Sequence, residues 1–162
     1  MNNNSNSQKW NLMEVTKMID QILEVFHAKH RADLEMLIPL SEKVESVHAD
    51  HADVPKGLAD FLKHLYGELS SHMQKEEEIL FPMIKNGQGM MAHGPIQVMQ
   101  HEHVDHISNL ENLKNLAKDY VLPEGACGSW QALYSGVATL EKEIREHIAI
   151  ENDFLFPKAL NS

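Results

Sequence analysis

The stretch HMQKEEEILFP at residues 72–82 returns in altered form as HIAIENDFLFP at residues 147–157, and these two stretches decide the fold. Each begins with a histidine, carries a glutamate four residues later and ends in Leu-Phe-Pro at the same offset. On a helix, residues four apart lie on one face about a turn apart, so each histidine can chelate a metal ion together with its glutamate. The repetition indicates that one local arrangement is used twice.

The repeat extends upstream of both stretches. His27 precedes His72 by nearly the same interval as His103 precedes His147. Each half therefore has a lone histidine on one helix and a chelating pair on the next, and we interpret the chain as two copies of a helical hairpin. The local spacing recurs as well: His27, His30 and Leu34 match His103, His106 and Leu110.

Four amphipathic segments contain these stretches. Apolar residues recur at helical spacing over residues 12–47, 55–85, 95–120 and 130–160, with polar, turn-like segments between them and a kink expected at Pro39. No sustained alternation of period two predicts a strand. Four such segments joined by short polar loops predict an all-α antiparallel four-helix bundle, built from two duplicated helical hairpins.

The composition narrows the class of protein. With 162 residues, 43% of them hydrophobic, the chain is about one domain long, and its net charge of −10 argues against nucleic acid or an anionic membrane as partner. The single cysteine, Cys127, excludes an intramolecular disulfide and fits a reducing compartment, so we expect a cytoplasmic protein. The start, MNNNSNSQ, does not resemble a signal peptide. We predict a disordered polar tail over residues 1–11 and one domain over residues 12–162.

Both repeated stretches place a charged residue where apolar residues are expected. A glutamate on a core-facing stripe is costly unless its charge is compensated. Exposing the histidine and glutamate instead would expose the leucines beside them. The two stripes are Leu65, Leu69, His72, Glu76 and Leu80, and Leu140, Ile144, His147, Glu151 and Leu155. We therefore expect six residues to converge in the bundle centre: His27, His72, Glu76, His103, His147 and Glu151.

Four imidazoles and two carboxylates suit a pair of first-row metal ions, although the donor types alone do not choose between iron, manganese and zinc. If both glutamates bridge, each ion has four protein ligands, and an oxygen bridge or an exogenous ligand completes the sphere. A ferritin-type site fits less well, because Leu69 and Ile144 stand three residues before His72 and His147. The zinc protease motif is absent from the sequence. Nucleophilic catalysis by Cys127 is an alternative, as is a simple packing role for that residue.

These residues make the chain similar to hemerythrin-like domains and, more closely, to the iron-sulfur cluster repair family of di-iron proteins. The matching segments include FHAKHRADL, VHADHADVPKGL, ELSSHMQKEEEILFPMI, GPIQVMQHEH, LPEGACGSWQALY and EHIAIENDFLFPKAL, and cover nearly everything after the polar tail. The resemblance implies a hemerythrin-like bundle and a non-haem di-iron centre. It also implies a bacterial cytosolic protein that restores iron-sulfur clusters damaged by nitric oxide or oxidants.

The resemblance assigns a role to each of the six residues. Two iron ions, joined by an oxo bridge, are the cofactor that we expect. The terminal ligands would be His27, His72, His103 and His147, and the bridges Glu76 and Glu151.

The chain departs from related patterns in two places. Members of the repair family commonly carry an N-terminal domain with a cysteine motif, and this sequence has no such cysteines. Oxygen-carrying hemerythrins have a His-x-x-x-His on the third helix and an aspartate on the last. Here Ile107 stands four residues after His103, and Glu151 supplies the last carboxylate.

Supply of iron to damaged iron-sulfur proteins is the function that the resemblance favours, and we favour an iron donor over a classical enzyme, with no catalytic residue assigned. Glu68 and Glu102 are candidates for an iron path. His30 and His106 are candidates for hydrogen-bond partners of the metal ligands. For all four residues, an exposed position on a helix surface is the simpler alternative. Three other functions stay open because the six residues do not separate them: binding or sensing of dioxygen or nitric oxide, reduction of nitric oxide or peroxide, and a metal-free interaction domain.

Overall fold

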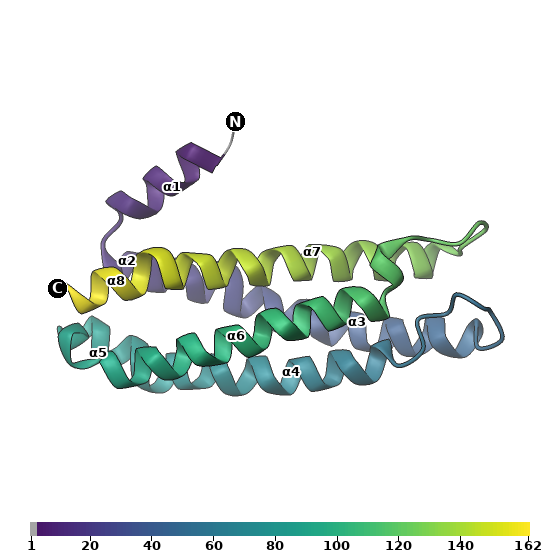
Figure 1. The fold of residues 1–162 in the computed structure, drawn as a ribbon, viewed down its shortest axis with the longest axis horizontal. Helices are drawn as coiled ribbons and strands as arrows, with labels where there is room; N and C mark the ends of the chain where they lie inside the picture. Colours follow the sequence, from purple (N-terminus) through teal and green to yellow (C-terminus); the bar gives the residue numbers. More distant parts are fainter. Residues whose placement is uncertain (1–2) are drawn as a thin grey trace.

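A computed structural model describes residues 3–162 of the chain. Four long helical rods lie side by side, and each runs opposite to the one before it (Figure 1). The first rod consists of α2 (Val15–Gln21), η1 (Ile22–His27) and α3 (Ala28–Val47). The second consists of α4 (Leu58–Lys75), η2 (Glu76–Leu80) and α5 (Phe81–Lys85). The third rod is α6 (His93–Leu116) alone. The fourth consists of α7 (Gly128–Ile150), η5 (Glu151–Leu155) and α8 (Phe156–Leu160). The predicted all-α antiparallel bundle is confirmed.

The rods form a four-cornered bundle. α3 packs against α4 and α7, and α6 packs against the same two helices. Short 3₁₀ turns, η3 (Gly89–Met91) and η4 (Lys118–Tyr120), lie in the connections on either side of α6. α3 continues through Pro39, where the sequence predicted a kink. Residues 3–162 contain no strand, in agreement with the absence of period-two alternation.

A carboxylate from the first rod starts the second. Gly57 precedes α4 with a φ of 91°, a backbone conformation that favours glycine because it has no Cβ. Glu45 accepts hydrogen bonds from the backbone N–H groups of Gly57 and Ala59, at 2.7 and 3.0 Å. These are N–H groups that a helix leaves without an internal partner. The contact joins the two helices of the first hairpin.

Two rods contain a π-helix that begins at a glutamate of the repeated stretches. The N–H of Phe81 bonds to the carbonyl of Glu76, and that of Phe156 to the carbonyl of Glu151, each five residues back. Proline follows both phenylalanines, and a proline ring has no N–H and crowds the carbonyl four residues before it. The wider turn accommodates both constraints. π-turns inside α-helices are frequent at functional sites. The third π-helix, η1, contains no proline.

Two apolar clusters fill the bundle and leave a polar layer between them. One cluster occupies the end where α3 meets α4, with Leu65 and Leu140 among its fully buried members. The other occupies the opposite end and includes Phe81 and Phe156. Among the described residues, the buried polar side chains other than Ser41 are histidines and glutamates, and on each rod they lie where one cluster gives way to the other. The core thus positions one polar layer inside an otherwise apolar bundle.

The N-terminal segment differs from the predicted disordered tail. Helix α1 (Asn3–Leu12) stands away from the four rods in Figure 1. Trp10 anchors it, because that side chain is buried in the second apolar cluster. Lys158 donates from Nζ to the carbonyl oxygens of Asn11 and Met13, at 2.5 and 2.7 Å. Contacts with distant residues therefore order a segment whose own composition does not suggest it; residues 1 and 2 lie outside the described residues.

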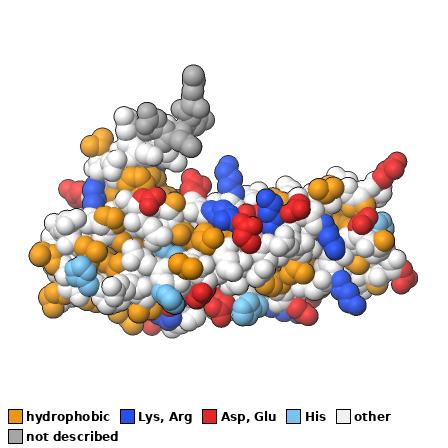
Figure 2. All heavy atoms as spheres, viewed as in Figure 1, with side chains coloured by type: hydrophobic (Ala, Val, Ile, Leu, Met, Phe, Trp, Pro, Cys, Tyr) orange, Lys and Arg blue, Asp and Glu red, His pale blue; other side chains and the backbone are white. Residues whose placement is uncertain are grey.

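On the face shown in Figure 2, Lys and Arg side chains alternate with Asp and Glu, and no continuous basic area is visible there. None of the helices within residues 3–162 combines the length and the apolar character that crossing a lipid bilayer demands.

Candidate metal centre

The six residues expected to converge do meet in the polar layer. They form two groups that could each hold a metal ion, and within each group the ligand atoms lie within 4.8 Å of one another. One group is His27, Glu76, His147 and Glu151, and the other is His72, Glu76, His103 and Glu151. Glu76 and Glu151 belong to both groups, and all six residues are exposed by 5% or less.

The atoms that face the centre are the Nε2 atoms of the histidines and the oxygens of the glutamates. Oε1 of Glu76 lies 3.3 Å from Nε2 of His27 and 3.4 Å from Nε2 of His72. Glu151 contacts Nε2 of His103 through Oε1 and Nε2 of His147 through Oε2, both at 3.0 Å. Each carboxylate therefore spans the two groups, as a bridging ligand would.

Several of these atoms lack a hydrogen-bond partner although they are buried. They are Nε2 of His27, both carboxylate oxygens of Glu76, and Oε1 of Glu151. Buried polar atoms without partners are rare, because each costs about 1–3 kcal/mol. Imidazole nitrogens and carboxylate oxygens are ligands of first-row metals. The donor set therefore fits a pair of metal ions, which would satisfy these atoms together.

The protonation states suit the same role. Burial lowers the pKa of His27 to about 4, and burial lowers the pKa of His72 to about 3. Both rings are therefore neutral near pH 7, the form that binds a metal. Burial, followed by the charge of Glu151, raises the pKa of Glu76 well above its ordinary value. Burial also acts to raise the pKa of Glu151, but His147 and His103 outweigh it and hold that pKa well below its ordinary value.

Aromatic rings pack behind three of the histidines. Phe81 stacks on His27 with ring centroids 5.8 Å apart, and Phe156 stacks on His103 at 5.9 Å. These two pairs are equivalent in the duplicated hairpins, since each phenylalanine belongs to a Leu-Phe-Pro triplet. The ring behind His147 is Phe26, at 5.2 Å.

Each histidine of the centre also has a partner on its outer nitrogen, Nδ1. His27 donates to Glu77 at 2.7 Å, His72 donates to Glu102 at 3.1 Å, and His103 donates to Asn152 at 2.9 Å. Nδ1 of His147 lies 3.1 Å from Nε2 of the buried His30. Such partners fix the ring orientation of metal-binding histidines and leave the inner nitrogen free for the metal.

The two outer carboxylates are themselves held by cations. Arg31 donates two hydrogen bonds to Glu77, both at 3.0 Å, and Lys75 donates one to Glu102 at 2.7 Å. Burial acts to raise the pKa of Glu77, but the hydrogen bonds from Arg31 and His27 leave it below its ordinary value. The pKa of Glu102 is lowered in the same way, against burial, by Lys75 and His72.

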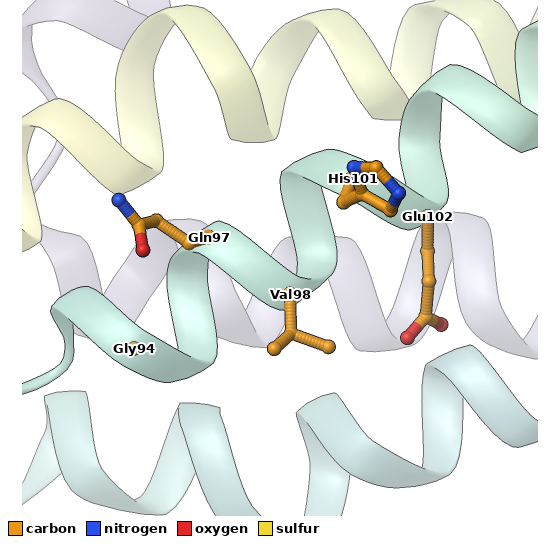
Figure 3. Close-up of a pocket in the computed structure, with 5 residues that line it drawn as sticks. All are labelled: Gly94, Gln97, Val98, His101 and Glu102. Atoms are coloured by element: carbon orange, nitrogen blue, oxygen red, sulfur yellow. The ribbon is translucent and has the colours of Figure 1, made fainter.

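The residues predicted around the centre fall into different places. Glu102 contacts His72 and also lines a surface hollow on α6, seen in Figure 3 together with Gly94, Gln97, Val98 and His101. Glu68 is exposed on α4. His30 is buried against His147, and the ring of His106 lies 4.8 Å from that of His72.

Cys127 lies outside both metal groups. It lies directly before α7, and its Sγ atom is 3.2 Å from Nε2 of His48, which follows α3. Neither residue belongs to the centre.

Sequence reasoning missed Glu77, Asn152, Arg31 and Lys75. Glu77 and Asn152 directly follow the glutamates of the repeated stretches, so they occupy equivalent positions of the two stretches and could have been found by aligning them. Nothing in the sequence marks Arg31 or Lys75, because their roles depend on which rod lies beside them.

Comparisons with known proteins agree with this geometry. The family model described as hemerythrin HHE cation binding domain matches residues 18–159. The iron-sulfur cluster repair protein YtfE of Pectobacterium carotovorum is 49% identical over 156 residues, which cover 96% of this chain and 71% of that protein. YtfE of Salmonella typhimurium is 45% identical over 151 residues, covering 93% and 69%. YtfE of Escherichia coli is 47% identical over 151 residues, with the same coverage.

The resemblance expected from the repeated stretches is thereby confirmed over nearly the whole chain. The buried histidines and glutamates form two adjacent groups consistent with a di-metal centre, in a domain of a cation-binding family. This chain belongs to the hemerythrin HHE cation binding domain family and, within it, is a homologue of the iron-sulfur cluster repair proteins.

Proposed function

We propose that this protein is a non-haem di-iron protein that supplies iron for the repair of iron-sulfur clusters damaged by nitric oxide or oxidative stress. One observation carries the proposal: six buried side chains meet in two adjacent groups in a homologue of iron-sulfur cluster repair proteins. In the proposal, His27, His72, His103 and His147 are terminal ligands and Glu76 and Glu151 bridge two iron ions, with an oxo bridge between them.

The donor set is compatible with holding ferric iron and giving up ferrous iron. Two carboxylates and four neutral imidazoles favour the more highly charged ion, so reduction weakens the attraction between the site and its cargo. Glu102 extends from His72 to a surface hollow, which supports a role at the start of an iron path. Glu68, exposed on α4, would lie further along that path. Damaged iron-sulfur proteins are the recipients in this proposal, and the single free cysteine fits a cytoplasmic location.

The test is anaerobic reactivation of an iron-sulfur dehydratase that nitric oxide has damaged. The iron-loaded protein is compared with a matched amount of free ferrous iron and with a Glu151→Ala variant. We expect reactivation beyond the free-iron control, and loss of that advantage in the variant. Reactivation no better than free iron, from a fully loaded protein, would contradict iron supply. It would direct attention to binding of dioxygen or nitric oxide, or to their reduction, at the same centre.

A further inference from the structure

The outer partners of His27 and His103 occupy equivalent positions in the two hairpins but differ in charge. Glu77 accepts a hydrogen bond from Nδ1 of His27, and Asn152 accepts one from Nδ1 of His103, at 2.7 and 2.9 Å. Each acceptor directly follows the glutamate of its own hairpin. The first hairpin therefore uses a carboxylate where the second uses a neutral amide.

A second difference accompanies the first. Arg31 stands four residues after His27, and its guanidinium donates hydrogen bonds from Nη1 and Nη2 to the two carboxylate oxygens of Glu77, each at 3.0 Å. The residue four places after His103 is Ile107, which packs against the first apolar cluster. A carboxylate at 29% exposure gains from a fixed counter-ion, whereas an amide needs none. The charge and its counter-charge thus occur together in one hairpin and are both absent at the equivalent positions of the other.

The geometry gives the cation an effect on the centre. An arginine stays protonated in proteins, so the carboxylate in its fork accepts hydrogen bonds and does not donate them. Oε2 of Glu77 therefore takes the hydrogen of Nδ1 of His27. Nε2 of His27 is then the nitrogen with the free lone pair, and it is the atom that faces Glu76 at 3.3 Å.

We propose that Arg31 is a positioning residue of the metal centre, which acts through Glu77 to set the tautomer and the orientation of His27. The inference rests on the proposed function only in taking the inner residues as metal ligands. Without the guanidinium, Glu77 is a partly exposed carboxylate with a single hydrogen bond from His27, and water competes for it. Asn152 performs the same task for His103 without a cation, because a neutral amide has a smaller desolvation cost.

The duplication supplies the experiment. Three variants form a double-mutant cycle: Arg31→Ile, Glu77→Asn, and both together, which copies the arrangement of the second hairpin. The iron-loaded proteins are mixed anaerobically with a ferrous chelator, and the rate of iron removal is measured. We expect Arg31→Ile to lose iron roughly tenfold faster than the wild type. The double variant should stay within about threefold of the wild type, because its amide needs no counter-charge. A wild-type rate in Arg31→Ile, or a double variant as fast as the single variant, would overturn the proposal.

A second readout uses the metal-free proteins. Nitrogen-15 NMR of the histidine rings reports which ring nitrogen carries the hydrogen. We expect the Nδ1–H form of His27 in the wild type and the double variant, and a mixture of both forms in Arg31→Ile. The control, Lys63→Ala, removes the cation of an exposed ion pair with Glu42 and should keep wild-type values throughout.

The outcomes separate the two proposals. If Arg31→Ile lowers only the melting temperature and leaves both the release rate and the tautomer unchanged, Arg31 is a structural residue and this inference is wrong. If the wild-type protein binds no iron, the proposed function fails, and the tautomer in the metal-free protein still decides the role of Arg31.

Discussion

The two hairpins repeat the residues that face the centre and differ in what stands behind them. In the first hairpin the residue before the leading histidine is Phe26, whose ring stacks on His147. In the second hairpin it is Glu102, whose carboxylate accepts a hydrogen bond from His72. The same position therefore closes one side of the centre with an apolar ring and the other with a partly exposed charged group. The contrast teaches that the inner layer keeps one geometry while its surroundings diverge.

The largest expected effect tests whether the inner layer is symmetric. Glu76→Ala and Glu151→Ala should each lose most of the bound metal, with affinity at least about 100-fold weaker, because each carboxylate belongs to both groups. Metal content per chain after gel filtration measures this. The control is Glu78→Ala, which removes an exposed glutamate that accepts a hydrogen bond from Gln74. Strong loss in only one of the two inner variants would show that the glutamates are not equivalent.

The next effect separates the two positions that the comparison contrasts. Phe26→Ala should lower the free energy of unfolding by about 3–5 kcal/mol, because it leaves a cavity in the apolar cluster. Glu102→Ala should cost less, about 1–2 kcal/mol, since it removes a partly exposed ion pair with Lys75 and the hydrogen bond from His72. Denaturant unfolding of the metal-free proteins measures both. Equal costs would show that the two sides are closed in the same way.

A smaller effect concerns the neutral partner in the second hairpin. Asn152→Ala should speed iron removal by a ferrous chelator roughly tenfold, because Nδ1 of His103 loses its acceptor. Its cost to unfolding should be about 1 kcal/mol, the scale of one neutral hydrogen bond. Asn152→Asp tests the charge separately. A rate that rises in Asn152→Asp as much as in Asn152→Ala would show that this position needs an amide and not merely an acceptor.

The smallest effect lies outside the centre and provides a baseline for acid sensitivity. Burial acts to raise the pKa of Glu141, but hydrogen bonds from Tyr120 and Arg145 leave it below its ordinary value. A folded-state pKa that is depressed contributes stability above the unfolded-state pKa, and this is lost as the pH falls through the folded-state value. Metal-free Glu141→Gln should therefore be less stable than the wild type near neutral pH, by about 1 kcal/mol or less, and the difference should shrink below about pH 4. A difference that persists undiminished in acid would contradict this assignment.

The positions of the rods and the six inner residues could be predicted from the sequence. Helical spacing locates the rods, and the second rod, predicted over residues 55–85, begins with α4 at Leu58 and ends at Lys85. The inner residues were found because a glutamate on an apolar stripe needs compensation, and because Glu151 repeats the setting of Glu76. Both patterns are local in the sequence, so they predict the inner residues without knowledge of the tertiary contacts.

Other features depend on contacts between distant segments. Helix α1 is ordered by Trp10 and Lys158, and its own Asn- and Ser-rich sequence gives no amphipathic signal. The pairing of Arg31 with Glu77 follows from the approach of two rods. Pro82 and Pro157 are a partial local signal for two of the π-helices. Residue spacing alone does not show that the helix forms a π-turn before each proline.

The sharing of the inner layer has a consequence for assembly. Each group takes two residues from the first hairpin and two from the second, so neither hairpin carries a complete set of ligands. A bound ion is then a cross-link between two halves of the chain, and its binding free energy adds to the free energy that docks them. If the chain were cut in the connection at residues 86–92, a bound ion would strengthen the association of the two hairpins. Under the proposed function the ion that the protein supplies would also be the ion that joins its two halves, so releasing it would lower the stability of the bundle.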